Sequence, residues 1–169
     1  MKLFGITGHS GMGKTTLLER LIPELRQRGC SVSLVKHSHK AIDIDRPGKD
    51  SHRLREAGCA EVLLIGDDRW ALMHELRGAE PPPVEFLIAR LQPCDLVLIE
   101  GFGHGEFPKL EVWREALGRP LLAVTRPGIV AVASDTPARV PAPWPALDLH
   151  ATAAIADLAL ARALPWLQP

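Results

Sequence analysis

Short apolar runs and amphipathic segments alternate along this chain, and the two classes predict different elements. Almost wholly apolar runs, such as residues 3–7 and 96–99, are typical of strands buried on both faces of a parallel sheet. The segment after Lys14 repeats its leucines every three or four positions, which predicts an amphipathic helix, and Pro23 predicts a kink in it. Alternating strands and helices predict an α/β fold with a mainly parallel central sheet flanked by helices.

The remaining elements are predicted by the same two patterns. Further strands are predicted at residues 31–36, 61–65, 70–76, 121–124 and 129–133, and further helices at residues 50–57, 84–91 and after residue 148. The turn Gly66-Asp67-Asp68 predicts a hairpin between two of these strands. Asp50 and Asp148 are predicted to cap helix N-termini, and Phe86 is predicted to point into the core.

The most informative motif lies between the first strand and the first helix. Residues 8–15 read Gly-His-Ser-Gly-Met-Gly-Lys-Thr and match the pattern G-x-x-x-x-G-K-[ST] in full. The glycines let the backbone turn around phosphate oxygens, and the start of the helix adds partial positive charge. Lys14 is predicted to reach the β- and γ-phosphates, and the Thr15 hydroxyl to bind Mg²⁺. The sequence therefore predicts a P-loop NTPase-like domain that binds a nucleoside triphosphate through these residues: His9, Ser10, Gly11, Met12, Gly13, Lys14, Thr15 and Thr16.

A carboxylate follows the most apolar of the predicted strands. Glu100 comes directly after residues 96–99, and ligands of open α/β sheets bind at the carboxyl ends of the strands. P-loop enzymes place an acid there that holds Mg²⁺ or orients an attacking water. We therefore predict that Glu100 joins Thr15 at the metal and Lys14 in catalysis, the alternative being an acid that merely ends a strand in solvent. Four residues that end other strands share the crevice only if their strands are neighbours: Lys36, His37, Ser134 and Asp135.

The polar segment from residue 37 to residue 50 collects side chains of the kinds that bind ligands. They are His37, His39, Asp43, Asp45, Lys49 and Asp50. We predict a switch-like segment in which a carboxylate, Asp45 or Asp50, reaches Mg²⁺ or water when a triphosphate is bound. His-x-His can also bind a transition metal, although neither a cysteine nor a third histidine stands close by. A solvated polar loop is the other alternative.

Length, net charge and cysteine content limit the kinds of partner and the location that we expect for this protein. The chain of 169 residues has the size of a single nucleotide-binding domain, and its 20 basic and 20 acidic residues cancel. No overall field therefore draws it to nucleic acid or to an anionic membrane. The isolated cysteines Cys30, Cys59 and Cys94 predict reduced, buried thiols in the cytoplasm. No apolar segment of signal-peptide length precedes the glycine-rich loop, and no uncharged apolar run approaches the ~20 residues that a membrane span requires, so we expect a soluble cytoplasmic protein.

Several motifs in a fixed order resemble the MobB family of molybdopterin-guanine dinucleotide biosynthesis adaptors. They are the loop of residues 8–16 with Leu21-Ile22-Pro23, then Lys36-His37-Ser38-His39, Asp43-Ile44-Asp45, Pro47-Gly48-Lys49-Asp50-Ser51, Arg69-Trp70-Ala71-Leu72-Met73, Glu100-Gly101-Phe102 and Ala131-Val132-Ala133-Ser134-Asp135. The resemblance implies a homodimer that binds GTP with Mg²⁺, hydrolyses it weakly, and assists the guanylyltransferase that joins GMP to molybdopterin in molybdenum cofactor synthesis. It also implies that residues 9–16 hold the phosphates, that Thr15 and Glu100 serve the metal, and that the segment from His37 to Asp50 faces nucleotide or pterin.

The chain departs from the family pattern at three places. Gly103 follows Glu-Gly-Phe where the family commonly has lysine, for which Lys109 is a nearby substitute. His9 stands where related dimeric NTPases often carry a second lysine. The chain contains no asparagine, so it lacks the guanine-reading motif Asn-Lys-x-Asp, and a preference for guanine is implied by the resemblance alone. Asp135 is our candidate for reading the base, because a carboxylate can accept from N1 and the exocyclic amine of guanine.

Two other functions are compatible with the same phosphate loop. A small-molecule or nucleoside kinase would use Asp43, Asp45 or Glu100 as base for an acceptor hydroxyl, and would transfer phosphate to that acceptor instead of to water. Such an enzyme needs an arginine-rich lid, to which Arg53 and Arg55 come nearest. A non-hydrolysing scaffold with nucleotide as a structural ligand is the second alternative, and in it Lys14→Ala would still support the transferase fully.

Overall fold

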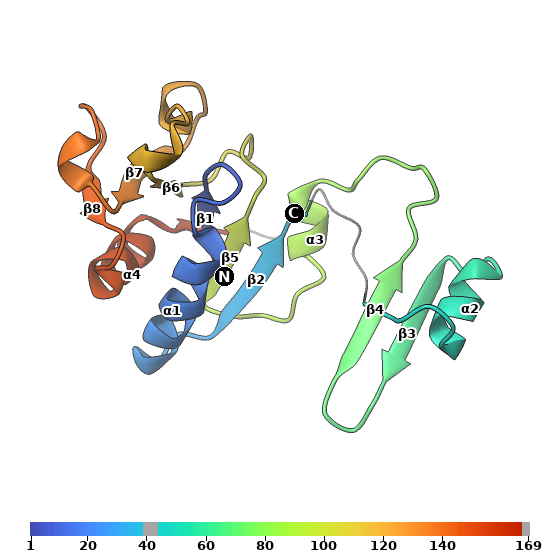
Figure 1. Cartoon of the computed structure of the whole chain (residues 1–169). Coiled ribbons are helices and arrows are strands. Elements are labelled where there is room, and N and C mark those ends of the chain that lie inside the picture. The colour runs from blue at the N-terminus through green and yellow to red at the C-terminus, as the bar shows by residue number, and fades with distance from the viewer. Residues whose placement is uncertain (39–43, 167–169) are drawn as a thin grey trace. The chain divides into compact units, whose positions relative to one another are not determined.

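The computed structural model describes residues 1–38 and 44–166, and the chain divides into two compact units (Figure 1). The core unit comprises residues 1–37 and 84–169, and the hairpin unit comprises residues 38–83. His39 and Asp43 of the predicted switch segment lie outside the described residues. That the whole chain acts as one nucleotide-binding domain stays a prediction.

The core unit is built on a mainly parallel sheet, as the sequence predicts. Its strands are β1 (Lys2–Thr7), β2 (Val32–Lys36), β5 (Leu96–Glu100), β6 (Lys109–Trp113), β7 (Ile129–Ser134), β8 (Ala146–Asp148) and β9 (Leu164–Pro165). The order across the sheet is β2-β5-β1-β6-β7-β8, and every neighbouring pair in this series is parallel. β9 runs antiparallel, beside β1. The carboxyl ends of the six parallel strands therefore meet at one edge of the sheet, where ligands of such folds bind (Figure 1).

Helices pack on both faces of this sheet, which explains why its central strands are apolar at successive positions. The helices are α1 (Lys14–Gln27), α3 (Val84–Ile88) and α4 (Thr152–Arg162). Phe4 and Ile6 of β1 pack in one apolar cluster with α1 and α4, whereas Leu3 packs in the other cluster with α3. Adjacent residues of a strand point to opposite faces, so both faces need apolar side chains. Pro23 lies inside α1, which is a single helix from end to end.

Residues 121–124 do not form the predicted strand. Three of them form a short 3-10 turn, η2 (Leu122–Val124), and the strand in this part of the sheet is β6, which the apolar pattern does not reveal. Lys109 and Glu111 of β6 are both fully buried, although charged residues are rare inside a central strand. The carboxylate of Glu111 accepts the backbone N–H groups of Leu122 and Ala123, each at 2.8 Å, and thereby holds η2 in place.

The helix from residue 84 is shorter than predicted, and it buries a different face from the predicted one. α3 directs Val84 and Ile88 into the core, so Phe86 on the opposite side is 46% exposed, which corrects its predicted burial. The guanidinium of Arg90 lies over the Phe86 ring, 3.9 Å from its centroid. This cation–π contact gives the aromatic ring a partner at the surface instead of in the core.

The two predicted aspartate caps are wrong in detail. Asp50 is the first residue of α2 (Asp50–Glu56), and Lys49 occupies the cap position. Asp148 ends β8, while the following helix α4 begins only at Thr152. The Asp148 carboxylate instead accepts the N–H of His150 at 2.8 Å, which stabilises the turn between strand and helix.

The hairpin unit contains the hairpin that the sequence predicts. β3 (Glu61–Ile65) and β4 (Trp70–His74) pair antiparallel, and α2 precedes them. The register sets Leu63 opposite Leu72 and Ile65 opposite Trp70, so these four side chains share one face. Ile65 is 83% exposed and Trp70 60% exposed, so this face, which we call the bare face, is apolar and open in the described chain.

Two further properties of the described residues concern the length of the helices and the state of the cysteines. Among the described residues, no helix is both long enough and apolar enough to cross a membrane. Cys30, Cys59 and Cys94 are free thiols, but Cys59 is exposed and the other two are only partly buried, which corrects their predicted burial. The cytoplasmic location expected from the sequence stays a prediction.

Candidate functional site

The phosphate loop joins β1 to α1, as the motif requires. Gly8 has a φ of 139°, and a Cβ at this position would overlap the carbonyl oxygen of Val112 in β6. Gly13 has a φ of 95° and stands directly before the first residue of α1. Residues other than glycine rarely adopt these backbone conformations. The glycines of the motif therefore meet a conformational demand at both ends of the loop, and at Gly8 a steric one as well.

The Lys14 side chain folds back onto the loop that precedes it. Its ammonium donates to the carbonyl oxygens of Gly8 and His9, each at 2.9 Å. Burial lowers the pKa of Lys14, an effect that the nearby Glu100 carboxylate opposes and the Lys36 ammonium reinforces. The residue begins α1, so its charge adds to the partial positive charge of the helix N-terminus. The loop thus presents a positive, backbone-lined concavity of the kind that binds phosphate.

The other residues predicted to bind nucleotide lie around this loop in two groups. Ser10, Gly11, Thr15 and Thr16 are exposed, so their polar groups are accessible to a ligand. The Met12 side chain is fully buried, and the imidazole Nε2 of His9 forms a hydrogen bond of 3.0 Å with the carbonyl of Pro120. These two side chains anchor the loop, and only their backbones remain for phosphate.

Glu100 lies beside the loop because of the strand order. β5 is hydrogen-bonded to both β1 and β2, and its register sets Glu100 opposite Ile6 on one side and Lys36 on the other. The Glu100 side chain is only 8% exposed. Its Oε2 lies 3.0 Å from Nζ of Lys36, and the same Nζ donates to the hydroxyl of Thr15 at 3.2 Å. Glu100, Thr15 and Lys36 thus form one cluster, which we call the cation cluster.

The cation cluster has the donors that Mg²⁺ requires. Oε2 of Glu100 is buried and has no hydrogen-bond partner among the described residues, and Nζ of Lys36 forms an ion pair with it at 3.0 Å. A buried carboxylate oxygen is stabilised by a cation, and in the described chain that cation is the Lys36 ammonium. Carboxylate and hydroxyl oxygens are hard ligands that suit Mg²⁺. The residues present therefore fit the metal, and they would be Thr15 and Glu100.

Transition-metal binding by the histidine pair stays an alternative, because His39 lies outside the described residues. Within residues 1–38 and 44–166, no group of three or more His, Cys, Asp or Glu side chains is arranged to hold a metal. His37 stands at the beginning of the segment, where its backbone N–H donates to the carbonyl of Glu100 at 2.9 Å. Its ring packs on Phe102 with centroids 5.1 Å apart. His37 therefore lies next to the cation cluster along the backbone.

The remaining residues of the predicted switch segment belong to the hairpin unit. The carboxylate of Asp45 is bound by the guanidinium of Arg55 through two hydrogen bonds of 2.6 and 3.1 Å. This pairing, above all, lowers the pKa of Asp45. Lys49 is exposed, and Asp50 is exposed beside Arg53 at 3.9 Å. Asp45 thus has a structural partner, which sequence reasoning missed because its ten-residue spacing from Arg55 follows no helical or strand period.

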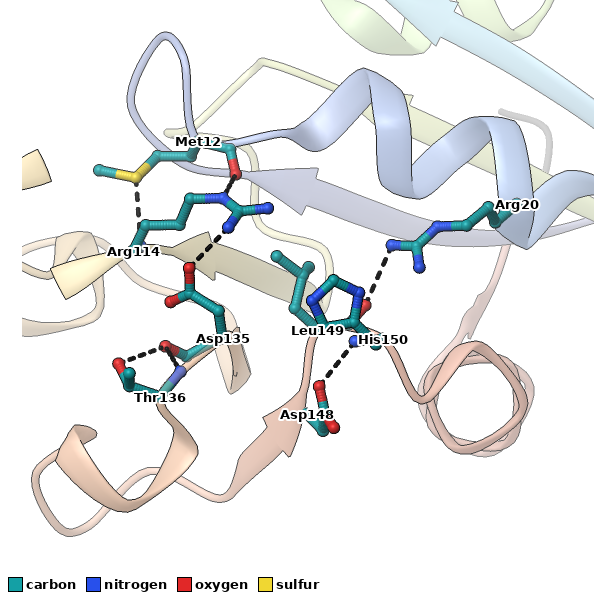
Figure 2. Close-up of polar contacts among 9 residues, drawn as sticks. Met12, Arg20, Arg114, Asp135, Thr136, Asp148, Leu149 and His150 are labelled. Carbon is teal, nitrogen blue, oxygen red and sulfur yellow. Dashed lines mark hydrogen bonds and ion pairs between the residues drawn. The ribbon is translucent and has the colours of Figure 1, made fainter. Parts of the chain in front are cut away.

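Arg114 is a site residue that the sequence analysis did not identify. It follows β6 directly, and its Nε donates to the carbonyl oxygen of Met12 in the loop at 3.1 Å (Figure 2). Its Nη1 donates to Asp135 at 2.6 Å, and a Cβ added to Gly13 would lie 3.5 Å from Nη2. No motif marks this arginine, because its strand was not recognised; recognition of β6 would have placed it at the ligand edge.

Asp135, the candidate base reader, follows β7 at the same edge of the sheet (Figure 2). Its carboxylate is held toward the phosphate loop by the ion pair with Arg114. Ser134 before it is fully buried and pairs in register with Asp148 of β8. The structure therefore brings Asp135 to the side of the loop opposite the cation cluster, since β6 and β7 lie on one side of β1 and β5 and β2 on the other.

Lys109 is not a substitute for the family lysine. Its side chain is fully buried, and Nζ donates to the carbonyl oxygens of Gly105, Phe107 and Pro127. These bonds tie the turn after β5 to the segment before β7. The expectation that this lysine serves the ligand site is therefore wrong, because its ammonium is bound by backbone within the fold.

Comparison with known proteins gives consistent results. The family model described as "MobB: Molybdopterin guanine dinucleotide synthesis protein B" matches residues 3–135. The chain is 40% identical over 169 residues to the molybdopterin-guanine dinucleotide biosynthesis adapter protein of Escherichia coli K12, covering 98% of this chain and 93% of that protein. It is 42% identical over 157 residues to the adapter protein of the same name from Haemophilus influenzae, with 92% and 85% covered.

Solved structures show the same fold. The crystal structure of Bacillus subtilis MobB superposes with a TM-score of 0.76 at 20% identity, covering 98% of this chain and 100% of that one. The MobB homologue of Bacillus stearothermophilus superposes with a TM-score of 0.67 at 21% identity, covering 94% and 95%. The predicted P-loop NTPase-like architecture is thereby confirmed.

Proposed function

Because the chain belongs to the MobB family of molybdopterin guanine dinucleotide synthesis proteins, we propose that it is an adapter in that synthesis which binds GTP with Mg²⁺ and hydrolyses it slowly. The observation that carries the nucleotide part is the complete phosphate loop, with Thr15 and the buried carboxylate of Glu100 beside it. The adapter part is supported by relatives of that name, which align over nearly the whole chain.

The residues of the core unit divide the binding of the nucleotide among them. The backbone of the loop and Lys14 bind the β- and γ-phosphates, and Lys14 exchanges its bonds to Gly8 and His9 for phosphate oxygens. Thr15 and Glu100 hold Mg²⁺, which when bound neutralises charge on the phosphate oxygens. Asp135 accepts from the guanine base, while Arg114 keeps its carboxylate beside the loop.

Slow hydrolysis is expected because the predicted catalytic acids and Arg114 already have other partners. The Glu100 carboxylate is assigned to the metal, and the Asp45 carboxylate is bound to Arg55 in the hairpin unit. Arg114 is bound to Met12 and Asp135, so its charge is directed to the loop and the base side. An arginine and a water-positioning residue in place raise GTP hydrolysis in other P-loop proteins by about 10³ to 10⁵. The adapter would therefore hold GTP for a partner guanylyltransferase instead of turning it over rapidly.

The same proposal includes a homodimer joined through the bare face of the hairpin unit. Leu63, Ile65, Trp70 and Leu72 form a contiguous apolar face on a two-stranded sheet. A lone hairpin is marginally stable in water, and apolar faces of this kind mark interaction sites. A second copy of the chain is present wherever the protein is made, so it can cover the face at all times. The segment from His37 to Asp50 leads into this unit and is our proposed contact for pterin or nucleotide.

Binding titrations test the nucleotide proposal. We expect the wild type to bind GTP more tightly with Mg²⁺ than without, and more tightly than ATP, while Lys14→Ala loses most of the affinity. Labelled γ-phosphate should appear slowly on water, and its appearance on a small acceptor would favour a kinase instead. Equal binding of GTP by the wild type and Lys14→Ala would contradict the proposal, provided that both proteins unfold at similar temperatures. Molybdopterin titrated against the same two proteins tests the pterin contact.

A further inference from the structure

Lys36 contacts both of the residues that we assign to Mg²⁺. Its Nζ lies 3.0 Å from Oε2 of Glu100 and 3.2 Å from Oγ1 of Thr15. These are the two oxygen atoms that we assign to Mg²⁺. A single cation, the lysine ammonium, thus bridges the ligands of the metal.

The fold fixes the acceptor and leaves the lysine free to move. Glu100 is the last residue of β5, an inner strand, and its side chain is 92% buried. Lys36 is the last residue of β2, at the edge of the sheet, and its side chain is 45% exposed. The parallel register sets the two residues opposite each other. The carboxylate therefore stays in place, while the long lysine side chain can swing into solvent at small cost.

The ammonium and the metal exclude each other at this carboxylate. Mg²⁺ binds oxygen ligands at about 2.0 to 2.1 Å in a near-ideal octahedron, which requires the space in which Nζ now lies. Two cations within a few ångströms of one another also repel strongly where water is partly excluded. Entry of the metal must accordingly displace Lys36 from Glu100.

We propose that the Lys36 ammonium holds the magnesium position in the nucleotide-free protein and leaves it only when metal and triphosphate enter together. The inference rests on the proposed binding of Mg²⁺ and GTP. The triphosphate would supply the charge that the displaced ammonium needs, because Lys36 already reaches Thr15 at the end of the phosphate loop, at 3.2 Å. Lys36 is therefore a positioning residue: it suppresses binding of the metal alone and couples the metal to the nucleotide.

Metal binding without nucleotide provides the first test. Mn²⁺ is titrated as the spectroscopic probe for the Mg²⁺ site and its free concentration is followed by electron paramagnetic resonance. Lys36→Met should bind Mn²⁺ about fivefold more tightly than the wild type. This factor corresponds to the free energy that a partly exposed ion pair contributes. Lys36→Arg keeps the cation and should behave like the wild type. Lys2→Met, which removes an exposed lysine from the start of β1, is the matched control and should change nothing.

The second test adds GTP to the same proteins. In the wild type, GTP should raise the affinity for Mn²⁺ by a larger factor than in Lys36→Met, and the difference should be about the same fivefold. Equal affinity of the wild type and Lys36→Met for Mn²⁺ alone, including no detectable binding by either, would overturn the proposal. The arm without nucleotide keeps the two ideas distinct: a protein that binds no GTP fails the proposed function, whereas the Lys36 result depends only on the metal.

Discussion

Arg114 and Asp135 form an ion pair of 2.6 Å between the ends of β6 and β7, and the same guanidinium donates to the carbonyl oxygen of Met12 in the phosphate loop (Figure 2). One side chain thus connects the loop that we assign to the phosphates with the carboxylate that we assign to the base. The connection gives Asp135 two separable roles, one toward guanine and one toward the loop.

Asp135→Asn separates these roles. An amide replaces one acceptor oxygen by a donor, so we expect affinity for GTP to fall by about tenfold, while affinity for ATP is unchanged. Competition of GTP and ATP against a fluorescent nucleotide measures both. An equal loss for the two nucleotides would mean that Asp135 acts on the loop through Arg114 and does not read the base. Asp148→Asn, at the end of the neighbouring strand β8, is the control.

Gly8→Ala tests the steric demand of the loop. We expect destabilisation by about 3 kcal/mol or more, because a Cβ would overlap the Val112 carbonyl in addition to straining the backbone. Gly29 also has positive φ, but a Cβ there meets open space, so Gly29→Ala should cost only about 1 to 2 kcal/mol. Denaturant unfolding of both variants measures the difference. A similar loss of stability in both variants would show that β6 can shift to accommodate the added Cβ.

Glu111 predicts a specific dependence of stability on pH. Burial raises the pKa of its carboxyl above the ordinary 4.5, against the opposing effect of the N–H groups of Leu122 and Ala123. Between the ordinary and the raised pKa the folded state binds a proton that the unfolded state does not, so the free energy of unfolding falls as pH rises through this window. Below pH 4.5 the folded and the unfolded state both bind this proton, so Glu111 adds no pH dependence to the free energy of unfolding there.

Denaturant unfolding at a series of pH values checks this sign. Glu111→Gln cannot titrate, so its unfolding free energy should lack the decline that the wild type shows above pH 4.5. The exposed Glu106→Gln should keep the decline. A decline of the same size in Glu111→Gln would assign it to another group.

Ile65→Lys tests the bare face of the hairpin unit. A charge at a residue that is 83% exposed should cost the monomer little, but it cannot be buried without a partner, so the proposed dimer should dissociate. Light scattering after size-exclusion chromatography, at several protein concentrations, gives the mass. Leu117→Lys, at an exposed leucine of the core unit, should leave the mass unchanged. A wild type that is monomeric throughout would refute the dimer.

The phosphate loop, the strand before Glu100 and the hairpin could be predicted because each depends on neighbours in the sequence. Eight consecutive residues specify the loop, and four consecutive apolar residues or a Gly-Asp-Asp turn specify the others. β6 escaped prediction because its buried Lys109 and Glu111 break the apolar pattern. Their charges are satisfied by backbone groups of segments that lie elsewhere in the sequence, at Pro127, Leu122 and Ala123.

The sequence alone thus determined that this protein has a phosphate loop with Lys14 and Thr15, since the geometry of such a loop is local. Only the tertiary structure decided which charges surround it. The strand order sets Lys36 and Glu100 in register on one side of the loop, and it brings Arg114 to Met12 across 102 positions of sequence on the other. The pairing of strands is a long-range property, and no local periodicity encodes it.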